Sequence, residues 1–246
     1  MARISIVIPV NNEQGNILPL LIMLEKELSS VEYYEVVCVE DCSCDETFTV
    51  LKQAAVTREN LRVIRLDRQC GQSAALWLGV QVASCPIIVS MDGDGQNDPA
   101  DIVPMLAFFL EQQQQGDDRL LVIGHRIDRH DSGWRKLSSW FGNRCQRLLL
   151  GESVPDNGCG LKMFPRNFFL TIPRFNHMHR FLPSLFRQNG GSVQSFPVHH
   201  HPRRHGNSHY GTFDRLKEGI MDIFGVWWLG RRSIISEQRI GERIHG

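Results

Sequence analysis

The sequence predicts an α/β protein in which a mostly parallel sheet is flanked by helices. Short apolar runs alternate with segments of helical periodicity over the first 125 residues. Acidic residues directly follow two of those runs, where ligands of such folds bind. The length of 246 residues, with 42% hydrophobic and 22% charged residues, suits one large globular unit and excludes a disordered chain.

Five mostly apolar runs are expected to be strands, because a parallel strand covered on both faces is rich in apolar residues. They are Ile4–Pro9, Val36–Val39, Leu61–Leu66, Ile87–Met91 and Leu120–Gly124. Between them we expect helices at Gly15–Leu28, at Phe48–Ala55 with Asp45 as N-cap, at Ser73–Ala83 and at Ala100–Gln113. Strands that alternate with helices pair in parallel, so their carboxyl ends share one edge of the sheet.

The second half of the chain is less regular. Trp134–Leu150 and Leu216–Leu229 are predicted amphipathic helices, and Ser192–Val198 is a predicted strand. We expect one domain over 1–211, followed over 212–246 by an amphipathic helix and a polar tail that form no separate domain.

The net charge of zero conceals an asymmetry between the two halves. Residues 1–118 carry 7 Lys and Arg against 18 Asp and Glu, and residues 119–246 carry 20 against 9. An acidic half suits a bound cation, and a basic half suits a phosphate-bearing ligand or an anionic membrane. Ordinary solvated faces are the alternative.

Composition also indicates a compartment. No run approaches the ~20 apolar residues that cross a bilayer. The N-terminal apolar run Ile4–Val10 is followed at once by Asn11, Asn12 and Glu13, so it is not expected to be a signal peptide. The seven cysteines lack the spacing of a disulfide framework. We therefore expect a cytoplasmic protein with reduced thiols.

The segment Asp92–Pro99 has the strongest chemical signal. Asp92 and Asp94 follow a predicted strand and are separated by a glycine, which allows a tight turn. Two such carboxylates suit Mg²⁺ or Mn²⁺, which complete their shells with water and a substrate diphosphate. A solvated turn is the alternative. Pro99 and a helix follow, so a calcium-binding EF-hand loop is excluded.

Other site classes are disfavoured. The sequence contains no GxGxxG after its first strand, no GxxxxGK[ST] and no HExxH. A histidine cluster has no cysteine nearby, so phosphate contact or surface display is favoured over zinc; it comprises His199, His200, His201, His205 and His209. Arg203 and Arg204 lie in no nucleic-acid-reading motif, so no nucleic-acid partner is expected. Cys42 and Cys44 do not form a CxxC redox motif.

Several segments resemble one family. Ile8–Glu13, Val39–Asp45 and Asp92–Pro99 are similar to the opening, the VDDGSxD segment and the metal motif of family 2 inverting glycosyltransferases with the GT-A fold. The last has the form found in polyprenyl-phosphate hexosyltransferases such as dolichyl-phosphate mannose synthase. Further matches, in the family's order, are Gly71–Ala75, Gly124–Arg126, Asp156–Lys162, His179–Pro183 and Arg203–Gly211.

The resemblance implies roles for individual residues. Those expected to bind the nucleotide sugar are Pro9, Asn11, Glu13, Asp41, Asp92, Arg126 and Arg203. The implied ligands of Mg²⁺ or Mn²⁺ are Asp92, Asp94 and Gln96, and the implied catalytic residues are Asp94, Arg126 and Asp156. Arginine suits the phosphates, because its guanidinium presents paired donors at fixed spacing.

This sequence departs from the family's pattern at four positions. Asn11 stands where the family has Tyr, and Glu40 stands where the family has the first Asp of its acidic pair. Cys42 replaces the family's Gly, and His209 replaces its Lys. These changes leave the donor open. If position 42 keeps a positive φ, Cys42 is strained there.

The implied activity is metal-dependent, inverting transfer of a hexose from a nucleotide sugar of the GDP-mannose or UDP-glucose class. The implied acceptor is a polyprenyl phosphate at the cytoplasmic face of the membrane. A phosphate monoester is already anionic near pH 7 and needs no base, whereas a hydroxyl acceptor would need one, for which Asp156 is the candidate. A soluble or lipid-A-like hydroxyl acceptor, and a non-catalytic nucleotide-sugar-binding protein, remain open alternatives.

Membrane contact is expected through the predicted helix near the C-terminus. Ile220, Phe224, Trp227 and Trp228 precede Arg231 and Arg232, and aromatic rings beside cations suit the lipid interface. The helix would then contact the membrane directly or through a separate membrane protein. The alternative is a helix that packs in the core or at the contact between two copies of a homo-oligomer.

Overall fold

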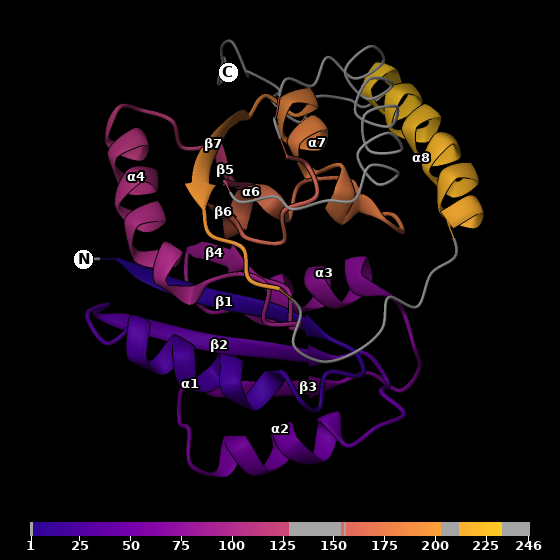
Figure 1. Ribbon diagram of the computed structural model, residues 1–246. Helices are drawn as coiled ribbons and strands as arrows, with labels where there is room; N and C mark the ends of the chain where they lie inside the picture. The colour runs from indigo at the N-terminus through magenta and orange to yellow at the C-terminus, as the bar shows by residue number, and fades with distance from the viewer. Residues whose placement is uncertain (1, 128–153, 155, 203–211, 233–246) are drawn as a thin grey trace, which may run out of the picture.

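The computed structural model describes residues 2–127, 154, 156–202 and 212–232 (Figure 1). Its sheet has seven strands in the order β3-β2-β1-β4-β6-β5-β7. The strands are β1 (Arg3–Val10), β2 (Tyr33–Glu40), β3 (Leu61–Arg65), β4 (Ile87–Ser90), β5 (Leu120–Arg126), β6 (Lys162–Pro165) and β7 (Ser192–Val198).

The strand directions place most carboxyl ends at one edge of the sheet. β1 pairs in parallel with β2 and β4, β2 with β3, and β5 with β7. β6 is antiparallel to both β4 and β5, so those two run in the same direction. Six strands therefore end at the edge where β6 begins, and the predicted α/β fold with a mostly parallel sheet is confirmed.

Helices cover both faces of the sheet (Figure 1). Alternate residues of a strand face opposite ways, so Ile6 of β1 packs with one helical layer and Val7 with the other. The first layer holds α1 (Ile17–Glu27), α2 (Thr47–Val56) and α4 (Ile102–Gln114), which follows the short 3₁₀ helix η1 (Pro99–Asp101). The second holds α3 (Gln72–Val82), α6 (Arg166–Phe169), η2 (Met178–Arg180), α7 (Leu182–Gln188) and α8 (Thr212–Arg232).

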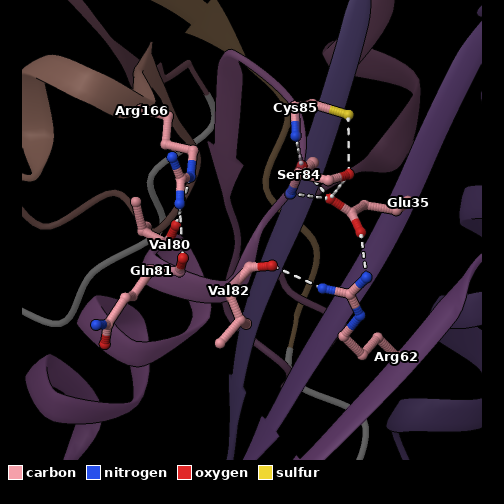
Figure 2. Close-up of polar contacts among 9 residues, drawn as sticks. Glu35, Arg62, Val80, Gln81, Val82, Ser84, Cys85 and Arg166 are labelled. Atoms are coloured by element: carbon pink, nitrogen blue, oxygen red, sulfur yellow. Dashed lines mark hydrogen bonds and ion pairs between the residues drawn. The ribbon is translucent and has the colours of Figure 1, made fainter.

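Helix α3 is held firmly at the end away from the shared edge. Arg166 donates from Nε to the Val80 carbonyl (3.0 Å) and from Nη2 to the Gln81 carbonyl (2.6 Å), and Arg62 donates to the Val82 carbonyl (2.6 Å) (Figure 2). Cations that bind the last carbonyls of a helix also complement its dipole. The opposite end of α3 therefore has a fixed position at the edge where the strands finish.

A close backbone approach fixes the same helix against the sheet. A Cβ at Gly79 would overlap the Val7 side chain of β1, so only glycine allows α3 to lie this near to the strand. Glu35 ties the α3–β4 connection to the sheet, because its carboxylate accepts from the Ser5 hydroxyl of β1 (2.6 Å). The same carboxylate accepts from the Ser84 N–H (2.6 Å) (Figure 2).

The structure differs from the sequence-based expectations in three respects. The second helix begins at Thr47 with Glu46 as N-cap, so the Asp45 N-cap prediction was wrong by one residue, although Asp45 Oδ1 accepts the Thr47 N–H at 3.0 Å. β6, α6 and α7 were not predicted. The helix near the C-terminus is longer than predicted and begins at Thr212. The division into 1–211 and 212–246 stays a prediction.

Candidate functional site

The predicted site residues follow neighbouring strands at the shared edge. Asp41 comes directly after β2, Asp92 follows β4, and Arg126 ends β5. His200 follows β7, and Lys162 opens β6 at the same edge. The shared strand direction therefore gathers the acidic loop residues and the arginine at one edge of the sheet, although they lie far apart in the sequence.

Asp92 is a carboxylate of this edge with a raised pKa. It lies at the amino end of α3, where its Oδ1 accepts from Gln72 Nε2 (2.8 Å). Burial raises the pKa of Asp92 to about 6 and the charge of Asp94 adds to the shift, while Lys162, the Gln72 bond and Arg126 oppose it. A partly buried carboxylate beside another carboxylate is stabilised in its charged form by a nearby cation.

The turn after Asp92 is held by its own side chains. Asp94 Oδ1 accepts the Gln96 N–H (3.1 Å), and Asn97 Oδ1 accepts the Asp92 N–H (3.3 Å). Gly160 packs directly against the Asp92 carboxylate, where any Cβ would overlap it. The turn therefore depends on a glycine that is 68 positions away in the chain and belongs to the segment before β6.

Arg126 and Asp156 form a two-pronged ion pair. Arg126 Nε lies 2.6 Å from Asp156 Oδ2, and Nη2 lies 2.8 Å from Oδ1. The Asp156 carboxylate is buried, with 4% of the residue exposed. The geometry orients the guanidinium, since fork-to-fork pairing with a carboxylate fixes its plane. In this arrangement Asp156 is the partner of Arg126, and its predicted role as a base stays a prediction.

The predicted nucleotide residues line the ends of β1 and β2. Asp41 accepts from the Cys70 N–H (2.6 Å) and the Gly71 N–H (2.7 Å), and its carbonyl accepts from Asn11 Nδ2 (2.7 Å). Glu13 is buried and accepts from Asn16 Nδ2 (2.6 Å). Pro9 lies on β1 beside Val39. Asp41 thus holds the loop before α3 in place, and its binding role stays a prediction.

The departure at position 42 keeps the left-handed backbone. Cys42 has φ +54° and Asn12, on the neighbouring loop, has φ +56°. The two loops are tied together, since Asn12 Oδ1 accepts the Cys44 N–H (2.9 Å) and the Asn12 N–H donates to Ser43 Oγ (2.9 Å). Cys42 is therefore strained, as expected for a residue with a Cβ at positive φ.

Three consecutive histidines tie the end of β7 to the Asp92–Asp101 segment. His199 Nδ1 lies 2.9 Å from Asp101 Oδ1, and His201 Nε2 lies 2.9 Å from Asp98 Oδ2. His200 Nε2 lies 3.3 Å from Gln96 Nε2, and burial lowers the pKa of His200. Of the predicted site residues, Arg203 lies outside the described part of the chain, as do His205, His209 and the predicted helix Trp134–Leu150.

Sequence reasoning assigned no role to several buried or partly buried residues of this edge. Lys162 is buried, donates to the Cys159 carbonyl, and has its pKa lowered by burial. Ser73 Oγ lies 2.7 Å from His179 Nδ1, and burial lowers the pKa of His179 to about 3, so that this histidine is neutral at pH 7. Ser73, Lys162 and His179 all lie in segments that resemble the family. That resemblance is the sequence feature that could have pointed to them.

The donor set fits a hard divalent cation that keeps part of its solvent shell. Asp92 and Asp94 supply carboxylate oxygens and Gln96 an amide, which is the chemistry that Mg²⁺ and Mn²⁺ accept. Within residues 2–127, 154, 156–202 and 212–232, no group of three His, Cys, Asp or Glu side chains is placed to hold a metal ion by itself. A cation here would need oxygen atoms from a substrate.

The model of the family described as "Glycosyl transferase family 2" matches residues 5–172. The chain belongs to this family. The resemblance seen in the sequence is thereby confirmed, and the matched range ends beyond β6 and α6, so it contains Asp92, Arg126 and Asp156.

Curated relatives of this family 2 glycosyltransferase share about a third of its residues. Dodecaprenyl-phosphate galacturonate synthase of Rhizobium johnstonii is 33% identical over 235 residues, which cover 93% of this chain and 68% of that protein. Undecaprenyl-phosphate 4-deoxy-4-formamido-L-arabinose transferase of Edwardsiella ictaluri is 33% identical over 211 residues, or 85% of this chain and 63% of that protein. The chain thus spans about two thirds of the length of such relatives.

Solved structures confirm the GT-A-like fold. Mannosyl-3-phosphoglycerate synthase from Rubrobacter xylanophilus has a TM-score of 0.68 at 13% identity, covering 97% of this chain and 78% of that one. Glucosyl-3-phosphoglycerate synthase from Mycobacterium tuberculosis, solved with Mn²⁺, UDP and phosphoglyceric acid, has a TM-score of 0.68 at 16% identity, covering 96% and 80%. At these identities the likeness concerns the fold alone.

Proposed function

We propose that this family 2 glycosyltransferase moves a sugar from a nucleotide sugar to a polyprenyl phosphate. The observation that carries the proposal is the gathering of Asp92, Asp94 and the oriented Arg126 at one edge of the sheet. Two relatives, each 33% identical, are named as a dodecaprenyl-phosphate galacturonate synthase and an undecaprenyl-phosphate 4-deoxy-4-formamido-L-arabinose transferase.

The chemistry follows from the charge that develops on the leaving group. Cleavage of a sugar–diphosphate bond leaves a nucleoside diphosphate with additional negative charge. A bound Mg²⁺ or Mn²⁺ at Asp92, Asp94 and Gln96 would neutralise that charge by Lewis-acid coordination. Arg126 contributes a fixed positive charge at the same edge, oriented in advance by Asp156.

The acceptor is a phosphate because the site then needs no base. Both Asp156 oxygens accept from Arg126, so the carboxylate is engaged in an ion pair. A phosphate monoester brings its own negative oxygen at pH 7, since its second pKa is about 6. A hydroxyl acceptor would instead require Asp156 to leave Arg126 and take a proton.

The donor is proposed as a nucleotide sugar of the GDP-mannose or UDP-glucose class. The named relatives concern galacturonate and 4-deoxy-4-formamido-L-arabinose, so nucleotide-linked forms of these sugars belong among the candidates tested. The reaction is proposed to take place at the inner face of the membrane.

Membrane contact is proposed through the outer face of α8. Met221, Phe224 and Trp228 are 70%, 57% and 56% exposed, while Val226 on the other face is buried. Arg231 lies 4.4 Å over the Trp227 ring near the end of the helix. Aromatic rings beside cations suit the lipid headgroup region. In the described part of the chain, no helix is long and apolar enough to span a bilayer.

The transfer reaction is tested with the purified protein, Mn²⁺, a panel of radiolabelled nucleotide sugars and undecaprenyl phosphate. The proposal predicts label in the organic phase for one donor, and loss of that label with EDTA or in Asp94→Asn. Val56→Asn, at an exposed position on α2, is the matched control and keeps full activity. Nucleotide binding without transfer to any acceptor would instead indicate a binding protein.

A further inference from the structure

An apolar pocket of about 360 Å³ lies between α3 and the segment before η2. Ala74, Trp77 and Leu78 line it from the helix, and Phe175 and Met178 line it from the opposite side. The volume falls at the lower end of the roughly 300–1,000 Å³ that small-ligand pockets occupy. The pocket is separate from the carboxylates and the arginine of the site described above.

One cation borders this apolar pocket. The Arg174 guanidinium lies 4.5 Å over the Trp77 ring and lines the same space. Across the described residues, no carboxylate lies within ion-pair distance of Arg174. Apolar walls with an exposed cation that lacks an acidic partner suit an amphiphile with an anionic head.

The pocket adjoins the candidate active site through the first turn of α3. Cys70 lines the pocket, while its N–H donates to Asp41. Two residues further on, Gln72 donates to Asp92. A ligand in the pocket therefore lies within about one helical turn of residues that contact the carboxylates of Asp41 and Asp92.

The loop that lines one side of the pocket also contacts α8. His177 lies between two pocket residues, Asn176 and Met178, and its Nδ1 is 2.8 Å from Asp222 Oδ2 of α8. The neighbouring Met221 belongs to the exposed apolar face of that helix. The loop that forms one wall of the pocket thus rests on the helix proposed to contact lipid.

We propose that this pocket binds the isoprenoid units of the acceptor nearest its phosphate, and that Arg174 favours the phosphorylated lipid over the neutral alcohol. The inference rests on the proposed function, which supplies the class of ligand. The limited volume takes a short section of the chain, and the rest extends toward the apolar face of α8.

The test uses Cys70 as a reporter of occupancy. Cys70 and Cys44 are both exposed thiols, but only Cys70 lines the pocket. Both are alkylated with a small maleimide, and their rates are followed by mass spectrometry with and without farnesyl phosphate. We expect saturating farnesyl phosphate to slow alkylation of Cys70 at least fivefold and to leave Cys44 unchanged. Farnesol should protect only at about tenfold higher concentration, because it lacks the charge that Arg174 attracts.

Variants make the test specific. Ala74→Trp fills the pocket and should abolish protection, while Val56→Trp adds the same bulk at a residue that is 83% exposed and should preserve it. Arg174→Gln, at an exposed residue, should remove the preference for farnesyl phosphate over farnesol, and it serves if Ala74→Trp does not fold.

Two results would overturn the inference. One is the absence of Cys70 protection by farnesyl phosphate, and the other is protection that persists in a folded Ala74→Trp protein. The assay measures binding, so it is independent of turnover. Protection without sugar transfer would contradict the proposed function alone, and transfer without protection would contradict the pocket alone.

Discussion

Arg126 meets Asp156 through two bonds, with Nε 2.6 Å from Oδ2 and Nη2 2.8 Å from Oδ1. The pair joins the end of β5 to the segment before β6, and it is mostly buried, with side-chain exposures of 16% and 5%. A buried guanidinium held at both prongs has one orientation. We therefore propose that Asp156 contributes to transfer by positioning Arg126.

This relationship predicts non-additive effects of substitution. Asp156→Asn and Arg126→Gln should each lower kcat about 10- to 100-fold, the loss expected when a charged hydrogen bond is broken. The double variant should be no worse than Arg126→Gln, because both changes remove the same oriented guanidinium. Steady-state kinetics of the three variants measures this.

A different outcome would restore Asp156 as a base. In that case the two losses would multiply in the double variant, and Asp156→Asn would lose the acidic limb of the pH–rate profile. Circular dichroism of each variant serves as the control for folding.

Substitution of Gly160 should weaken cation binding at Asp92, although the two residues are far apart in the sequence. Gly160→Ala places a methyl group where the Asp92 carboxylate lies, so the carboxylate must move. We expect Mn²⁺ affinity, measured by calorimetry with the nucleoside diphosphate present, to fall about 10- to 100-fold, as for changes beside metal ligands. Gly225→Ala, with open space around it, is the matched control. Unchanged Mn²⁺ binding in Gly160→Ala would contradict the assignment of Asp92 as a ligand.

His179 predicts an acid-sensitive contribution to stability. Burial lowers its pKa from 6.5 to about 3, with Lys162 and Arg180 adding to the shift. The unfolded chain therefore takes up a proton before the folded one, so the contribution is complete above pH 6.5 and is lost as the pH falls toward 3. Between pH 7 and pH 5 the free energy of unfolding should fall on the order of 2 kcal/mol more in the wild type than in His179→Gln.

Urea unfolding at the two pH values measures this difference. Equal losses in the wild type and His179→Gln would show that His179 is protonated without cost in the folded state. The Ser73 hydroxyl, 2.7 Å from His179 Nδ1, allows the glutamine to keep a hydrogen bond in the variant.

Cys42 predicts a stabilising substitution. Its φ of +54° is strained for a residue with a Cβ, and Cys42→Gly relieves that strain. We expect stability to rise by up to about 1 kcal/mol, while Cys42→Val should lower it, because a β-branched residue tolerates positive φ least. Cys44→Gly, on the same loop but without a positive φ, should destabilise. A lower melting temperature for Cys42→Gly than for the wild type would contradict this reasoning.

Much of the sheet could be predicted because its strands are buried on both faces. Ile4–Pro9 and Ile87–Met91 are apolar except for Ser5 and Ser90, and they correspond to β1 and β4. β6 could not be found in this way. It has only four residues, it begins with Lys162 and ends with Pro165, and its pairing with β4 and β5 is visible only in three dimensions.

The site shows a similar division. Asp92, Asp94, Arg126 and Asp156 stand out in the sequence, because motifs and the ends of strands mark them. The contacts that support them are long-range: Gln72 meets Asp92, Gly160 packs against the same carboxylate, and Ser73 meets His179. No local pattern encodes such pairs, because each depends on how distant segments pack.

The central claim is that the acceptor oxygen belongs to a phosphate monoester. The most direct measurement is the intact mass of the lipid product together with its ³¹P resonance as a function of pH. The account predicts a mass equal to the prenyl phosphate plus one sugar residue, and a phosphorus that no longer titrates near pH 6, because a diester lacks the second ionisation. A glycosylated lipid whose phosphate still titrates near pH 6 would place the sugar on a hydroxyl and contradict the account.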